Sequence, residues 1–163
     1  WTSWMGRVAD LGGRHLYAIA AHGATIYLAG EQGLLERSTD GGASFVRVRS
    51  PYRGTYFVAA VLPSGALFVG GLRGHAFLSR DGERTFTRVS AGASLSLSGV
   101  EAAPDGGLVV TTQSGQLLRW RPGARALEPL AARRTVALGA LSGVAYAPDG
   151  GLLVVGVTGA TRL

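Results

Sequence analysis

A step of 41 residues recurs through the sequence and restricts the chain to repeat architectures. The segment 38–45 returns as 79–86 with its serine, aspartate and phenylalanine unchanged, at an offset of 41. Glycines that close small turns keep that step twice and then lengthen it to 44, at Gly33, Gly74, Gly115 and Gly159. Repeats of this length are typical of solenoids and propellers, in which one supersecondary unit stacks on the next.

Each repeat consists of four short segments rich in Val, Leu, Tyr and Phe, separated by glycine-containing turns. No window has apolar residues at helical spacing, and 26 glycines among 163 residues favour many tight turns. The sequence therefore predicts an all-β fold, a β-propeller of about four blades of four antiparallel strands. The predicted strands are 17–22, 25–29, 34–39 and 45–49, then 56–62, 66–70, 75–80 and 85–89, then 99–103, 107–112, 116–121 and 127–130, and finally 143–147 and 152–157.

The second strand of every repeat is a continuous apolar run, at 26–29, 66–69, 108–110 and 152–155. A strand that is buried on both faces has this pattern, because neighbouring blades cover both of its sides. We expect one partial propeller domain over 1–163, with repeats at about 9–50, 51–90, 91–131 and 132–163. The repeat phase predicts that 1–8 is a strand completing a neighbouring or the last blade, and that the whole belongs to a larger propeller. A closed ring of four blades is the alternative.

The recurring turn has the pattern Ser-x-Asp-x-Gly-x-x-aromatic, for which we predict a structural role. An aspartate in such a turn can accept hydrogen bonds from backbone N–H groups, and glycine permits a positive φ. Glu83 replaces the expected glycine in the second copy, and the third copy has lost the serine and aspartate. The predicted structural residues are Ser38, Asp40, Gly42, Phe45, Ser79, Asp81 and Phe86.

Charge and composition narrow the function classes. The formal net charge is +6, and all sixteen basic residues are arginines scattered along the strands without a basic run. We therefore predict no nucleic-acid partner. No cysteine is present, and the three histidines have no spacing typical of metal ligands, so we predict no cofactor and no metal.

The turn motif is an Asp-box and resembles the bacterial neuraminidase repeat. Three further stretches, Gly30-Glu31-Gln32-Gly33, Ser50-Pro51-Tyr52-Arg53-Gly54 and Gly70-Gly71-Leu72-Arg73-Gly74, look like the photosystem II stability and assembly factor family, especially its relatives in non-photosynthetic bacteria. The resemblance covers most of 16–159. It implies a seven-bladed, exported propeller, and hence a periplasmic or otherwise exported location, whose photosynthetic members bind a membrane-protein partner and assist its assembly.

Strand order places the loop 50–55 on the same rim as the turns between second and third strands. Loops on a rigid scaffold commonly carry binding function. The candidate binding residues are therefore Glu31, Tyr52, Arg53 and Arg73. A tyrosine and two arginines could hold a carboxylate or a peptide terminus. The alternative is that Tyr52 packs the joint between blades while the arginines are solvated.

We accordingly predict a non-catalytic binding or assembly module that holds a protein or peptide, with open blade edges also available for self-association. The alternative is a sialidase-like glycoside hydrolase or a carbohydrate-binding remnant of one. Tyr52, Arg53 and Arg73 supply fragments of such a site, and Glu101 lies at an inner-strand position. No second carboxylate is suitably placed, because Asp105 and Asp149 belong to Pro-Asp-Gly turns, so we assign no catalytic residue.

Overall fold

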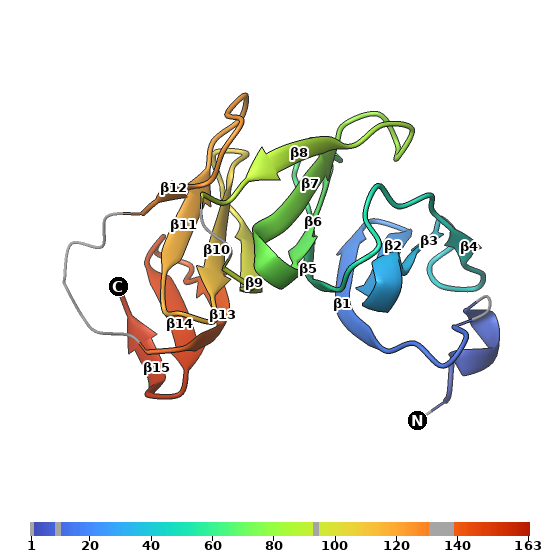
Figure 1. Ribbon diagram of the computed structural model, residues 1–163, viewed down its shortest axis with the longest axis horizontal. Coiled ribbons are helices and arrows are strands. Elements are labelled where there is room, and N and C mark those ends of the chain that lie inside the picture. The colour runs from blue at the N-terminus through green and yellow to red at the C-terminus, as the bar shows by residue number, and fades with distance from the viewer. Residues whose placement is uncertain (1, 9–10, 93–94, 131–138) are drawn as a thin grey trace.

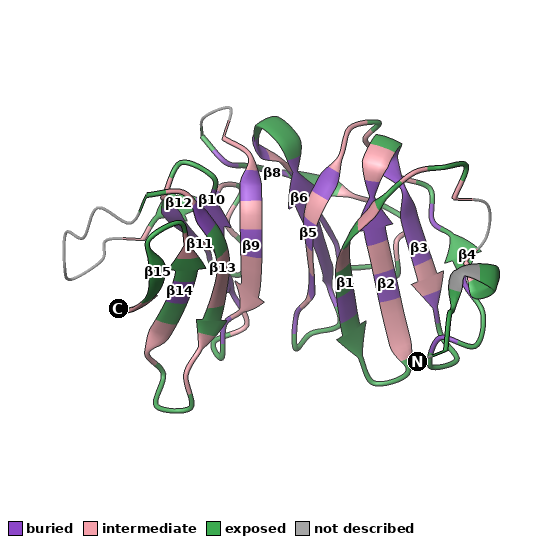
Figure 2. Ribbon diagram, turned by 90° about the horizontal axis from the view of Figure 1, so that it is seen from below, coloured by how far each residue is buried: buried purple, intermediate pink, exposed green. Residues whose placement is uncertain are grey.

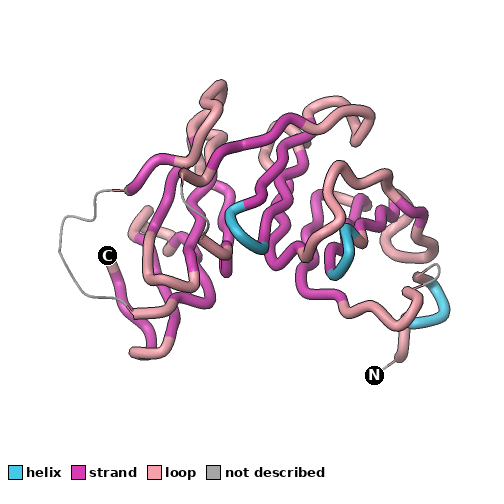
Figure 3. Tube along the Cα trace, in the orientation of Figure 1, coloured by secondary structure: helices cyan, strands magenta, loops and turns pink. Residues whose placement is uncertain are grey.

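The computed structural model describes residues 2–8, 11–92, 95–130 and 139–163, and these are built almost wholly of short strands (Figures 1 and 3). The helices among them are single 3-10 turns: η1 (Met5–Arg7), η2 (Glu31–Gly33) and η3 (Leu72–Gly74). Within the described residues, no helix has the length and apolar character needed to cross a membrane. The predicted all-β fold is confirmed.

The strands form four separate antiparallel sheets, each in simple sequence order. Sheet 1 contains β1 (Leu16–His22), β2 (Thr25–Gly30), β3 (Leu35–Ser38) and β4 (Val46–Arg47). Sheet 2 contains β5 (Tyr56–Val61), β6 (Leu67–Gly71), β7 (His75–Ser79) and β8 (Thr87–Ser90). Sheet 3 contains β9 (Leu97–Ala102), β10 (Leu108–Thr112), β11 (Leu117–Trp120) and β12 (Glu128–Pro129). Sheet 4 contains β13 (Leu141–Tyr146), β14 (Leu152–Gly156) and β15 (Gly159–Arg162).

The sheets follow one another along an arch, with sheet 1 and sheet 4 at its two ends (Figure 1). Their first strands β1, β5, β9 and β13 are in sequential contact. Four such sheets side by side are propeller blades. The predicted strand over 1–8 is not found, because the chain forms η1 there and Trp4 lies on Gly42 of sheet 1 instead of beside sheet 4.

Apolar side chains fill the spaces between adjacent sheets. One core joins sheets 1 and 2, a second joins sheets 2 and 3, and a third joins sheets 3 and 4. Strands β6 and β10 are buried at every residue because each has a sheet on both sides, as their continuous apolar runs predicted (Figure 2). Phe68 is fully buried between sheets 2 and 3, and its truncation to alanine should cost about 3–5 kcal/mol.

Candidate functional site: an arginine-bearing loop platform

Three loops meet on one rim of the arch. The Gly33 N–H of η2 donates to the carbonyl oxygen of Gly54 at 2.7 Å, and the Leu72 N–H of η3 donates to the carbonyl oxygen of Thr55 at 3.0 Å. The loop 50–55 is therefore held between the two 3-10 turns. We call residues 31–33, 50–55 and 72–74 the arginine platform. The backbone thus brings these three loops together, as the strand order predicted.

Glycines allow this close approach. A Cβ on Gly33 would lie 2.0 Å from the carbonyl oxygen of Tyr52, and one on Gly71 would lie 2.2 Å from that of Thr55. Any side chain at these positions would push the loop out of place, since real Cβ contacts are never so short. The platform is consequently a packed unit of backbone rather than a set of independent loops.

Tyr52 anchors the platform to sheet 2. Its ring stacks on His75 with centroids 4.5 Å apart and packs edge-on against Tyr56 at 5.6 Å. Its hydroxyl donates a long 3.4 Å hydrogen bond to the carbonyl oxygen of Leu72. Burial raises the pKa of the neighbouring Tyr56 to about 12. These contacts agree with the alternative that Tyr52 packs within the fold. Its predicted role in binding stays a prediction.

Arg53 and Arg73 are the cationic groups that the platform presents to solvent. Both are exposed, and neither makes a hydrogen bond or ion pair with any part of the chain that the structure describes. Arg73 lies at the tip of η3 with φ of +56°, a left-handed conformation that only glycine adopts readily. Beside it, Leu72 is 37% exposed. The platform therefore carries two unpaired guanidinium groups and one exposed apolar side chain on loops that backbone hydrogen bonds hold together.

Glu31 is engaged elsewhere. It accepts hydrogen bonds from the backbone N–H of His15 at 3.0 Å and from the Tyr17 hydroxyl at 3.1 Å. The His15 contacts lower the pKa of Glu31, and its carboxylate raises the pKa of Tyr17. Its carboxylate thus ties η2 to the start of β1.

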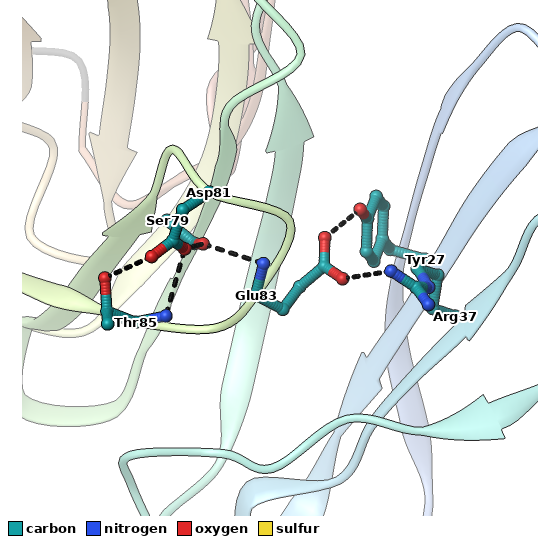
Figure 4. Close-up of polar contacts among 6 residues, drawn as sticks. All are labelled: Tyr27, Arg37, Ser79, Asp81, Glu83 and Thr85. Atoms are coloured by element: carbon teal, nitrogen blue, oxygen red, sulfur yellow. Dashed lines mark hydrogen bonds and ion pairs between the residues drawn. The ribbon is translucent and has the colours of Figure 1, made fainter.

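The opposite rim carries the two serine–aspartate turns, 38–45 and 79–86, which repeat one hydrogen-bond pattern. In the first, Asp40 accepts from the Ser44 N–H at 3.0 Å and from the Ser44 hydroxyl at 2.6 Å. In the second, Asp81 accepts from the Thr85 N–H at 2.9 Å and from its hydroxyl at 2.6 Å (Figure 4). The Ser38 hydroxyl, which also donates to Asp40 at 2.6 Å, and then the Ser44 bonds lower the pKa of Asp40. The Thr85 bonds lower the pKa of Asp81 to about 2. The carboxylates are thus used within the turns.

Glu83 is a residue whose importance the repeat pattern did not reveal. It occupies the glycine position of the second turn with φ of +63°, and its side chain reaches across to sheet 1. There the carboxylate accepts from the Tyr27 hydroxyl and pairs with Arg37 at 2.6 Å (Figure 4). Only 6% of the Glu83 side chain is exposed. The departure from glycine was the signal in the sequence, and its meaning is a link between sheets 1 and 2.

The carboxylates considered for hydrolysis lie apart from the platform. Asp105 and Asp149 accept backbone N–H bonds from Gly107 and Gly151, each at 3.1 Å, in the turns that follow β9 and β13. Those turns belong to the opposite rim, and each aspartate pairs with an arginine, Arg119 or Arg162 respectively. Glu101 is half-buried on β9, and burial raises its pKa. No carboxylate pair therefore faces the two platform arginines in the described part of the chain.

Comparisons with solved structures place the fold among β-propellers. YCF48 bound to a D1 peptide is similar with a TM-score of 0.66 at 19% identity, over 87% of this chain and 46% of that one. The computationally designed Ika4 protein has a TM-score of 0.72 at 10% identity, over 96% of both chains. An ancestral GH74 enzyme has a TM-score of 0.64 at 15% identity, over 86% of this chain and 22% of that one.

At these identities the likeness shows the fold alone. The chain spans less than half the length of the YCF48 structure. No protein-family model matches the sequence, and no curated protein matches it either.

Proposed function

We propose that the chain is a binding module that captures a protein or peptide segment bearing a free carboxylate on the arginine platform. The observation that carries the proposal is the pair of exposed, unpartnered arginines, Arg53 and Arg73, on loops that backbone hydrogen bonds hold together. A guanidinium group offers parallel N–H donors that match a carboxylate.

The packing of the platform supports this function energetically. Binding costs less conformational entropy when the loops are already ordered, and here the Gly33–Gly54 and Leu72–Thr55 bonds fix both loops beforehand. The half-exposed Leu72 offers apolar contact beside the charges. A peptide end with one apolar side chain and a carboxylate is the simplest ligand that uses all three groups.

A sequence resemblance and a structural likeness, both to propellers of the photosystem II assembly factor type, support a peptide or protein partner. The sequence resembles the photosystem II stability and assembly factor family in stretches that include Tyr52, Arg53 and Arg73. The structure is similar to YCF48, which was captured with a D1 peptide. We propose, on the same resemblance, that the partner is a membrane protein and that the chain is exported.

The glycosidase alternative has less support. The GH74 enzyme shares the fold, which hosts many functions. A retaining or inverting glycosidase usually requires two carboxyl groups flanking the bond to be cleaved. In the described residues, Asp105 and Asp149 are committed to turns on the far rim.

The test is a binding titration monitored by fluorescence anisotropy. The probe is a labelled peptide with an apolar last residue and a free carboxyl terminus, and its C-terminal amide is the reference. We expect the amide to bind more weakly, and Arg53→Ala/Arg73→Ala to reduce affinity for the free acid about tenfold or more.

The matched control is Arg88→Ala/Arg125→Ala, which removes two exposed arginines between sheets 2 and 3 and leaves the platform intact. Equal affinities for acid and amide, or equal losses in the two double variants, would contradict the proposed site. Release of sugar from a glycoside panel by the chain would instead favour the hydrolase.

A further inference from the structure

Most of the largest exposed apolar side chains gather at the two ends of the arch. Ile19 of sheet 1 is 68% exposed, and Leu153 and Val155 of sheet 4 are 40% and 44% exposed. Figure 2 shows the same contrast, with the buried strands β6 and β10 inside and exposed residues along β1 and β14. Each end therefore has exposed apolar side chains on a sheet face that no other described sheet covers.

The end face of sheet 4 repeats positions that are buried in every other sheet. Leu153 has the same position in sheet 4 as Tyr27, Phe68 and Val109 have in sheets 1, 2 and 3. Each of the four lies on the second strand of its sheet and pairs with the residue at the same register position of the first strand. Those three residues are at most 4% exposed, since each packs toward the following sheet. Sheet 4 therefore presents an apolar side chain at a position that packs against the following sheet elsewhere in the molecule.

The end face of sheet 1 carries the complementary half. Ile19 lies on the first strand of sheet 1 and pairs with Leu28 of the second strand. Ala59, Val100 and Val144 have the same position on the first strands of sheets 2, 3 and 4. In sheets 2, 3 and 4 these residues pack against the core shared with the preceding sheet. Ile19 has the same place in sheet 1, which is the first of the described sheets.

Trp4 marks the outer edge of that face. Glu83 reaches from sheet 2 toward the preceding sheet, and Gly42 is its equivalent in sheet 1. A Cβ on Gly42 would lie 2.2 Å from the Trp4 ring, so the tryptophan covers this point. Arg7 lies on the same turn and donates to the carbonyl oxygen of Gly42 at 3.4 Å. The described part of sheet 4 has three strands.

We propose that these two faces bind each other between two copies of the chain, with sheet 4 of one copy packed on sheet 1 of the other. Within one chain the faces lie at opposite ends of the arch and cannot meet (Figure 1). A second copy supplies both missing halves at once, so two copies close a ring through two identical interfaces. The inference is independent of peptide binding on the platform.

The experiment is size-exclusion chromatography with light scattering on the 163-residue chain. We expect a mass of twice 16.8 kDa at about 10 µM. Val155→Arg and Ile19→Glu should each give the single-chain mass with an unchanged far-ultraviolet circular dichroism spectrum. Val46→Arg is the matched control, because Val46 is 55% exposed on β4 outside both end faces, and it should leave the mass doubled.

Mixing the two variants tests the head-to-tail arrangement. Each retains the face that the other has lost, so an equimolar mixture should recover the doubled mass. A single-chain mass for the unsubstituted protein up to about 100 µM would overturn the proposal and leave another occupant, such as further blades of a longer polypeptide. An open series of higher multiples, or no recovery on mixing, would also overturn it.

Discussion

Both rims of the arch carry charged side chains, but the two rims use them in different ways. On the rim of the serine–aspartate turns, Asp40, Asp81 and Glu83 all have partners within the chain. On the platform rim, Arg53 and Arg73 have none among the described residues. Groups satisfied internally stabilise a fold, whereas fixed and unpaired groups remain free to bind. The difference predicts that substitutions on one rim change stability and that substitutions on the other change binding.

Among substitutions on the two rims, the largest effect is expected at Glu83, which links sheets 1 and 2. Glu83→Ala leaves Arg37 and the Tyr27 hydroxyl without their partner, and we expect a loss of about 2–3 kcal/mol, below the range for fully buried pairs because Arg37 is partly exposed. Urea unfolding measures the free energy. Peptide affinity should not change. A variant as stable as the parent would show that the link contributes nothing.

Arg73→Gly should separate binding from stability on the platform. Glycine relieves the positive φ of +56°, so we expect stability to rise by about 0.5 kcal/mol while peptide affinity falls about tenfold. Gln32→Gly is the matched control, because Gln32 has φ of +52° at the equivalent position of η2. It should gain similar stability and keep its affinity. If both variants lost the same affinity for the peptide, the loss could not be assigned to the Arg73 side chain.

Acid should lower the stability that the aspartates of the serine–aspartate turns contribute to the fold. The pKa of Asp81 is depressed to about 2 in the fold, so its contribution is present above the unfolded value near 4 and is lost as pH falls toward 2. Thermal unfolding of Asp81→Asn should therefore give a lower Tm than the parent at pH 6. The difference should shrink between about pH 4 and pH 2. A difference independent of pH would assign the effect to something other than the carboxylate.

The smallest effect is expected for Tyr52→Phe. The hydroxyl makes only a 3.4 Å bond, while the ring keeps its stacking on His75. We expect changes below about 0.5 kcal/mol in both stability and peptide binding free energy. A marked loss of affinity with unchanged urea unfolding would place the hydroxyl in contact with the ligand and extend the site beyond the two arginines.

The fold was largely predictable because the repeat exposes the same pattern several times. Continuous apolar runs located the buried strands β6 and β10, and the turn motif located both serine–aspartate turns. The N-terminal segment was wrongly predicted as a strand. The repeat spacing of Trp4 indicated that its side chain packs on the repeat, as its contact with Gly42 shows, but the spacing carries no information on the backbone conformation of the segment.

The candidate site was predictable only in part. Strand order brings the platform loops together, and hairpin topology can be deduced from the repeat. The partners of individual side chains depend on three-dimensional packing. Nothing in the repeat indicated that Glu31 would bind His15 and Tyr17, or that Glu83 would reach Tyr27.

The most direct test of the proposed function is a nuclear magnetic resonance titration of the ¹⁵N-labelled chain with the free-acid peptide. We predict chemical-shift changes concentrated at 31–33, 50–55 and 72–74, including the side-chain Nε–H signals of Arg53 and Arg73, with the turns 38–45 and 79–86 unaffected. Shifts centred on those turns, or none at peptide concentrations of about 1 mM, would contradict binding on the arginine platform.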